Sequence, residues 1–208
     1  DRCLSRGLGD VYKRQGLPQS GVKIKINPEN NEIMMSGAFV MKGYYKDKER
    51  TDETIKDGWL CTGDQGKIDE DGYLYITGRV KDTFKTSKGE FIEPLGLEKF
   101  FGDTVEFEQI CIVGLGNPQP MLLVVLSESG KSTDKNVLKS MIENKLIAVN
   151  KDLVSYKRIS TIIFVKDDWN PENEILTPTM KIKRNKINDK YCEKFKDWSE
   201  NIETVIWE

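Results

Sequence analysis

Three side chains of this sequence could together bind a nucleotide. Asp64 closes a Thr-Gly-Asp turn, Arg79 ends the strand that follows it, and Lys181 lies in a loop much further along the chain. A carboxylate can accept hydrogen bonds from ribose hydroxyls, an arginine can donate to the same sugar, and a lysine can pair with a phosphate. Each of the three residues alone indicates little; a Thr-Gly-Asp turn, for example, is common in proteins. Taken together, the three side chains could converge on one nucleotide.

The residue types that are missing narrow the chemistry further. Histidine is absent from the 208 residues, which excludes Ser-His and Cys-His nucleophiles and imidazole metal ligands. None of the four cysteines forms a CxxC pair, and the apolar, strand-like surroundings of Cys61 and Cys111 predict buried thiols. This cysteine usage is typical of a reducing compartment, so we expect a cytoplasmic protein.

The charges of the chain nearly cancel. There are 32 lysines and arginines against 34 acidic residues, a net charge of -2. Such a balance produces no overall field that would attract nucleic acid or an anionic membrane. The sequence also has no apolar run near the roughly 18 residues that a membrane-spanning helix needs.

The first fifteen residues, Asp1–Gln15, differ in character from the rest of the chain. They have neither a helical nor an alternating apolar period, and they resemble a translated sequencing adapter. We therefore expect residues 1–15 to be a non-native artefact without regular packing. The alternative is a native N-terminal arm.

Hairpins dominate residues 16–78. Alternating apolar positions predict one hairpin over residues 21–35, and a second over 65–77 turns at an Asp-Gly pair. The polar residues 46–54 suit a short helix between them. We expect this part of the chain to be the β-rich end of a larger domain.

From residue 79 onward, strands alternate with helices. The expected elements are a small hairpin at 84–92, a helix from Pro94, strands at 108–113, 121–126 and 159–165, a helix over 134–150 and a closing helix over 186–198. This alternation predicts an α+β domain over residues 79–208. The fold class predicted for the whole chain is therefore α+β, a small C-terminal domain joined to the end of a β-rich one.

Residues 58–64, 72–82 and 84–92 closely resemble the AMP-forming acyl-CoA synthetases, and the long-chain fatty acid branch most of all. The similarity runs from about Gly16 to the C-terminus, and Leu176–Lys181 lies where that family has its adenylation lysine loop. The resemblance implies an acid–thiol ligase. Such enzymes activate a carboxylate with ATP to give acyl-AMP, and a small C-terminal domain then rotates before CoA displaces AMP.

The resemblance also implies roles for five residues. It places Asp64 on both ribose hydroxyls and Arg79 on the same sugar. It makes Lys181 the catalytic cation between the substrate carboxylate and the α-phosphate. Gly89 falls in the hairpin that approaches the pantetheine of CoA, and Lys81 falls on the hinge between the two domains.

The expected cofactors are ATP or AMP, CoA and Mg²⁺, with the metal ligands and the triphosphate loop outside this chain, which itself has no predicted metal site. The expected substrate is a fatty acid or a similar carboxylate. A peripheral membrane contact of the full-length protein is compatible with that substrate, and nucleic acid is not an expected partner. Because the acyl pocket is also outside the chain, we expect the chain to be inactive by itself.

Two other interpretations remain open at this stage. A basic segment at residues 181–190 could make the chain a non-catalytic module that binds phosphates or RNA, although it lacks the stacking aromatic residues of single-strand binders. Another adenylate-forming ligase with a different acid substrate is the second alternative. Cys61 and Glu90 depart from the fatty acid branch, where histidine and lysine are common at these positions.

Overall fold

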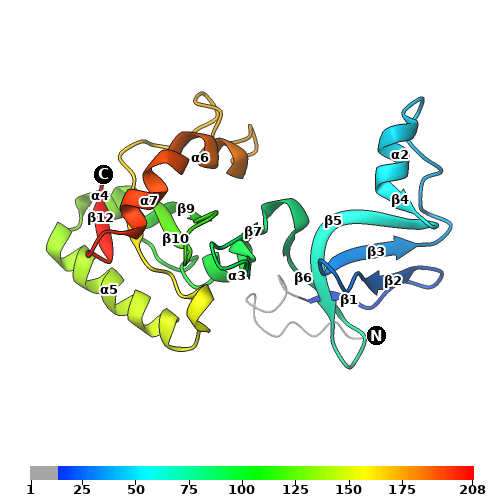
Figure 1. Ribbon diagram of the computed structural model, residues 1–208, viewed down its shortest axis with the longest axis horizontal. Helices are drawn as coiled ribbons and strands as arrows, with labels where there is room; N and C mark the ends of the chain where they lie inside the picture. The colour runs from blue at the N-terminus through cyan, green and yellow to red at the C-terminus, as the bar shows by residue number, and fades with distance from the viewer. Residues whose placement is uncertain (1–13) are drawn as a thin grey trace. The chain divides into compact units, whose positions relative to one another are not determined.

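The computed structural model describes residues 14–208, which form two compact units, one ending at Asp82 and the other spanning Thr83–Glu208 (Figure 1). The expectation for Asp1–Gln15 therefore falls mostly outside the described residues. The last two residues of that range, Arg14 and Gln15, belong to strand β1 (Arg14–Gly16), which pairs with strand β6 (Leu74–Arg79).

The first unit is built around one antiparallel sheet. Its strands are β1, β2 (Lys23–Ile26), β3 (Glu32–Ser36), β4 (Ile55–Lys56), β5 (Trp59–Ile68) and β6 (Leu74–Arg79). The strand order is β1-β6-β5-β3-β2, and β4 pairs with β5. The expected hairpins are confirmed as the pairs β2–β3 and β5–β6. The ten-residue β5 runs through the middle and pairs with three other strands.

Local chemistry explains the connections of this sheet. The β5–β6 turn is closed by the Asp69 carboxylate, which accepts hydrogen bonds from the backbone N–H groups of Asp71 and Tyr73 at 3.1 and 2.8 Å. Helix α2 (Lys48–Thr54) begins where the Asp47 side chain accepts a hydrogen bond from the N–H of Arg50. Both are the local side-chain to backbone bonds that aspartate favours at turns and helix starts.

The second unit contains a four-stranded mixed sheet, a small hairpin and several helices. The strands are β9 (Phe107–Val113), β10 (Met121–Leu126), β11 (Ile162–Phe164) and β12 (Val205–Trp207), and the hairpin is β7 (Phe84–Lys85) with β8 (Phe91–Ile92). The helices are α3 (Pro94–Glu98), α4 (Glu128–Ser132), α5 (Lys135–Lys151), α6 (Arg184–Tyr191) and α7 (Phe195–Ser199). The sheet order is β12-β11-β10-β9, antiparallel between β9 and β10 and parallel elsewhere.

Both faces of this sheet are covered. On one face Leu122 and Val124 belong to an apolar cluster that includes Leu138 and Ile142 of α5. The intervening residues of β10 point to the other face, where they join a second cluster with Ile187 and others from α6 and α7. Figure 1 shows α5 on one side of the sheet and α6 and α7 on the other. Successive strand residues point to opposite faces, so a strand covered on both sides must be apolar at every position.

The structure differs from the sequence predictions in several details. The expected closing helix is divided into α6, a 3-10 turn (Cys192–Lys194) and α7. Strand β12 pairs with β11 although no strand was expected there. Cys111 is buried as predicted, but Cys61 is only half-buried. Burial and the nearby Glu32 carboxylate raise the pKa of the Cys61 thiol.

No helix within residues 14–208 is both long and apolar enough to cross a lipid bilayer.

The two-sided burial of β10 leads to a stability prediction. Leu122 is fully buried, so Leu122→Ala should leave a cavity and lower the free energy of unfolding by about 3 kcal/mol. Val137→Ala, at a position 61% exposed on α5, is the matched control and should change it by less than about 0.5 kcal/mol. Urea unfolding followed by tryptophan fluorescence measures both, since Trp207 belongs to the same apolar cluster as Leu122. Equal effects of the two substitutions would contradict the described core.

Candidate functional site

Asp64 and Arg79 lie directly opposite each other on the neighbouring strands β5 and β6. Arg79 Nε is 3.4 Å from Asp64 Oδ1, and the two side chains are 69% and 37% exposed respectively. Opposed cross-strand residues hold their side chains close together. The structure thus brings two of the predicted site residues into one ion pair that solvent, and hence a ligand, can reach.

A distortion of β5 presents Asp64. Along β3 the register moves by two residues, from Met34 to Glu32, while along β5 it moves by four, from Cys61 to Gln65. The Thr-Gly-Asp segment therefore protrudes from the β3–β5 ladder, while Asp64 keeps its pairing with Arg79 of β6. Such a β-bulge turns side chains away from their regular direction. Gly63 lies within the protrusion at a φ of 76°, a left-handed conformation that glycine adopts without strain.

Polar contacts with β3 fix this protrusion. The Glu32 carboxylate accepts a hydrogen bond from the N–H of Gly63 at 2.9 Å, and the Thr62 hydroxyl donates to the carbonyl of Ile33 at 2.8 Å. The Asp64 N–H donates in turn to the Thr62 hydroxyl oxygen at 3.2 Å. The backbone that leads into Asp64 is thereby held to β3.

A second set of contacts continues beyond Asp64. Gln65 is 4% exposed, and its amide Nε2 donates to the carbonyl of Asn30 at 2.7 Å. The N–H of Gly66 donates to the carbonyl of Asn31, and a Cβ on Gly66 would lie 2.5 Å from the carbonyl oxygen of Tyr75. Sequence reasoning missed these supporting residues, because Asn30 and Gln65 are 35 positions apart and no local pattern connects them.

Lys181 lies at the end of a tight loop in the second unit. The Thr177 N–H donates to the carbonyl of Lys181 at 2.8 Å, and the Met180 N–H donates to the carbonyl of Thr177 at the same distance. The N–H of Lys181 also donates to the Thr177 hydroxyl oxygen at 3.0 Å. The Lys181 side chain is exposed, and its ammonium forms no hydrogen bond or ion pair with any residue of the described range 14–208.

The two ends of this loop are anchored in the core. Leu176 is fully buried in the same apolar cluster as α6, and Ile182 packs against that cluster. Leu176 and Ile182 also form an antiparallel bridge. Outside the loop, Lys186 of α6 forms an ion pair with Glu174 at 2.8 Å. The backbone that carries the Lys181 ammonium is therefore fixed, while the ammonium itself extends into solvent.

Gly89 and Lys81 are the remaining predicted site residues. Gly89 turns the β7–β8 hairpin with a φ of 83°, and its N–H donates to the carbonyl of Thr86 at 3.0 Å. No atom lies within 4 Å of a Cβ built on Gly89, so the turn is open to solvent. Lys81 lies in the 3-10 turn Val80–Asp82, the last element of the first unit.

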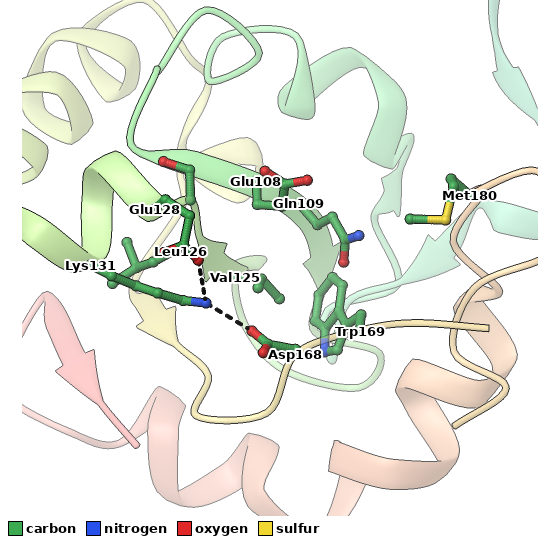
Figure 2. A pocket seen from close by; sticks show the side chains of 10 residues that line it. Glu108, Gln109, Val125, Leu126, Glu128, Lys131, Asp168, Trp169 and Met180 are labelled. Carbon is green, nitrogen blue, oxygen red and sulfur yellow. Dashed lines mark hydrogen bonds and ion pairs between the residues drawn. The ribbon is translucent and has the colours of Figure 1, made fainter. Parts of the chain in front are cut away.

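A cavity of about 290 Å³ lies beside the Lys181 loop in the second unit (Figure 2). It is lined by Glu108, Gln109, Val125, Leu126, Ser127, Glu128, Lys131, Asp168, Trp169 and Met180. Figure 2 shows the Lys131 ammonium between Glu128 and Asp168, at 3.2 and 3.3 Å. Three carboxylates against one ammonium disfavour a phosphate, so this cavity is not suited to the nucleotide.

No candidate metal site is found within the described part of the chain. Residues 14–208 contain no group of three or more histidine, cysteine, aspartate or glutamate side chains placed to hold an ion. Of the predicted site residues, the Asp64–Arg79 pair and the Lys181 side chain are those with charged groups that solvent reaches and that the sequence assigned to the nucleotide.

Comparison with known proteins agrees with the motif analysis. The sequence profile of the AMP-binding enzyme C-terminal domain family matches residues 81–202. Fatty acyl-CoA synthetase B of Dictyostelium discoideum is 30% identical over 195 residues, which cover 85% of this chain and 29% of that protein. Long-chain-fatty-acid–CoA ligase 5 of Rattus norvegicus is 31% identical over 193 residues, which cover 83% of this chain and 28% of that protein.

A solved structure gives the same result for the fold. The A domain of the carboxylic acid reductase from Segniliparus rugosus, in complex with AMP and a co-purified carboxylic acid, superposes with a TM-score of 0.71 at 25% identity. The alignment covers 87% of this chain and 31% of that one. The α+β fold class is therefore confirmed as that of adenylate-forming enzymes.

The chain belongs to the AMP-binding enzyme C-terminal domain family, whose homologues include long-chain fatty acid CoA ligases. It spans about 30% of the length of the curated relatives described above.

The Glu174–Lys186 pair beside the Lys181 loop leads to a pH prediction. The hydrogen bond and charge of Lys186 lower the pKa of Glu174, so the carboxyl should titrate below the usual range of glutamate. Stability from the pair should be fully present above that range and be lost as the pH falls through the lowered pKa. A carboxyl ¹³C NMR titration measures the midpoint, and Lys186→Met should return it toward the ordinary value. An unchanged midpoint in Lys186→Met would contradict the pair.

Proposed function

We propose that this chain supplies the ribose-binding pair, the hinge and the lid of an AMP-forming acid–thiol ligase that acts on long-chain fatty acids. In the first half-reaction the fatty acid carboxylate attacks the α-phosphorus of ATP, giving acyl-AMP and pyrophosphate. In the second, the thiol of CoA attacks the acyl carbon and AMP leaves. The observation that carries the proposal is the accessible Asp64–Arg79 pair, held by the bulge of β5, in a chain of this family.

The Asp64–Arg79 pair suits a ribose. Asp64 presents two carboxylate oxygens, and a vicinal diol can donate one hydrogen bond to each. Arg79 is 69% exposed, and a guanidinium is a donor that can be directed at sugar oxygens. Because the backbone around Asp64 is held by β3, the carboxylate needs little reorganisation when the nucleotide binds.

Lys181 suits the adenylation step. The reaction brings a carboxylate and an α-phosphate together, and an ammonium between them offsets the negative charge that accumulates. Such catalysis requires a positioned cation and no proton transfer, which agrees with a chain that has no histidine. The core-anchored loop and the exposed ammonium of Lys181 meet this requirement.

The remaining roles complete the proposal. Gly89, in an open turn at positive φ, would let the backbone approach the pantetheine of CoA closely. Lys81, next to the Asp82–Thr83 boundary between the two units, would be the hinge for the rotation between half-reactions. Mg²⁺ would be held by residues outside this chain. A cytoplasmic location and a peripheral contact of the full-length protein with membranes, where its substrate partitions, belong to the same proposal.

A different acid substrate is the second candidate. The structural match to a carboxylic acid reductase domain supports it, since that match is as extensive as the one to fatty acyl ligases. Both candidates share the nucleotide chemistry and differ in the acyl pocket. Assay of acyl-adenylate formation over acids of different chain length distinguishes them.

The main test concerns Lys181 in a full-length protein that contains this segment. Lys181→Ala should reduce acyl-adenylate formation about a hundredfold, because one cation is lost where charge develops. It should leave thioester formation from supplied acyl-AMP close to the parental rate. Lys183→Ala, which removes an equal charge two positions away, should affect neither step. Equal losses in both half-reactions would contradict the assigned role. The isolated chain, which we expect to be inactive, provides the baseline.

The Asp64–Arg79 pair leads to a separate prediction. Asp64→Ala and Arg79→Ala should each raise the KM for ATP about tenfold or more, because charged hydrogen bonds to the ribose are lost. The KM for the fatty acid should change much less. Glu70→Ala, an exposed acid in the β5–β6 turn, is the control for a local loss of charge. A larger change in the KM for the fatty acid would contradict the assignment to the ribose.

A further inference from the structure

Glu98 and Arg184 form a largely buried ion pair in the second unit. Arg184 Nη2 lies 2.7 and 2.6 Å from the two carboxylate oxygens of Glu98, and the side chains are 18% and 11% exposed. Other ion pairs of this unit are more exposed; in Lys186–Glu174, for example, the side chains are 41% and 65% exposed. Two charges with so little solvent around them attract each other more strongly than an exposed pair does.

The pair also completes the edge of the sheet. β9 is an edge strand, and its residue Ile112 faces Leu122 of β10 on the inner side. On the outer side, the N–H of Ile112 donates to Glu98 Oε1 at 2.8 Å and its carbonyl accepts from Arg184 Nη1 at 3.2 Å. Backbone groups at a buried edge require partners. Here an ion pair from two different helices supplies both.

The sequence position of Arg184 connects this pair to Lys181. Arg184 is the first residue of α6 and lies three residues after Lys181. The N–H of Lys183, between them, donates to the carbonyl of Ile175 at 2.8 Å, which closes the base of the Lys181 loop. The guanidinium therefore fixes the C-terminal end of the loop to β9 and α3, while Leu176 fixes the other end to the core.

We propose that Glu98 and Arg184 are positioning residues for the adenylation step, because they hold the loop that presents Lys181. This inference rests on the proposed function for its kinetic consequence, but its structural part does not. A lysine at position 184 would keep the charge but has a single donor nitrogen. It could not bind Glu98 and the Ile112 carbonyl with the planar, two-nitrogen geometry of arginine.

A purely stabilising pair would behave differently from a positioning pair. Loss of a partner from a buried ion pair destabilises a fold wherever the pair lies. A stabilising role alone would lower protection from exchange throughout the unit by the same factor. A positioning role predicts a change concentrated at residues 175–183, with the interior of the sheet little altered.

The structural test uses this chain with Arg184→Lys. Amide hydrogen exchange at Thr177 and Lys183, whose N–H groups close the loop, should accelerate about tenfold. Exchange at Leu122 in β10 should change less than about twofold. The matched control is Lys190→Met, which removes the 2.6 Å pair with Asp167 further along the same helix and should leave the loop amides unchanged.

A second variant keeps the test decisive if Arg184→Lys does not fold. Glu98→Gln combined with Arg184→Met removes both charges and leaves no unpaired ion in the interior. It should fold and still show faster exchange at Thr177 and Lys183. Uniform acceleration across the unit, or none at the loop, in the variant that folds would overturn the positioning role.

The kinetic test uses a full-length protein containing the segment. Arg184→Lys should lower kcat for acyl-adenylate formation about tenfold, with the KM for ATP within about twofold and thioester formation from acyl-AMP unchanged. Equal losses in both half-reactions would overturn the inference. Absence of adenylation by the parental protein would instead refute the proposed function, and the exchange result would still decide whether the pair holds the loop.

Discussion

The burial of strand β10 on both faces is the constraint on which the second unit depends. Met121, Leu122, Leu123 and Val124 are all fully buried, because helices cover the sheet from each side. Dense packing of this kind leaves little freedom for the segments attached to it. The loop that carries Lys181 is one of these segments, since Leu176 at its start is part of the same core. A rigid position for an exposed cation thus follows from apolar packing beneath it.

The first unit positions its polar residues by a different means. Few of its described residues are fully buried. The Thr-Gly-Asp segment is held to β3 because the Gly63 N–H donates to Glu32 and the Thr62 hydroxyl donates to the carbonyl of Ile33, and the adjacent Gln65 amide donates to the carbonyl of Asn30. Because Gln65 is itself buried, its hydrogen bond to the backbone cannot be exchanged for one to water at low cost. Asp64 and Arg79 can therefore remain exposed to a ligand while the strands that carry them stay fixed.

The proposed chemistry makes use of both means of positioning, hydrogen bonds in the first unit and apolar packing in the second. A carboxylate and a guanidinium recognise an uncharged sugar by directed hydrogen bonds, so they require a defined orientation. An ammonium that stabilises a developing negative charge requires a defined distance. The bulge of β5 meets the first requirement, and the closed loop at Thr177–Lys181 meets the second. The Glu98–Arg184 pair extends the second arrangement to the edge of the sheet.

The sequence by itself determined the α+β class, the hairpins β2–β3 and β5–β6, the strands around β9 and β10, and the helix α5. Those elements are set by local alternation, turn residues and helical periodicity. Motif resemblance, not periodicity, indicated Asp64, Arg79, Gly89, Lys81 and Lys181. The tertiary structure alone decided the parallel pairing of β12, the division of the closing helix, the contacts of Gln65 and the pairing of Glu98 with Arg184. These depend on residues as many as 86 positions apart, whose meeting is set by packing and by the need to satisfy buried polar groups.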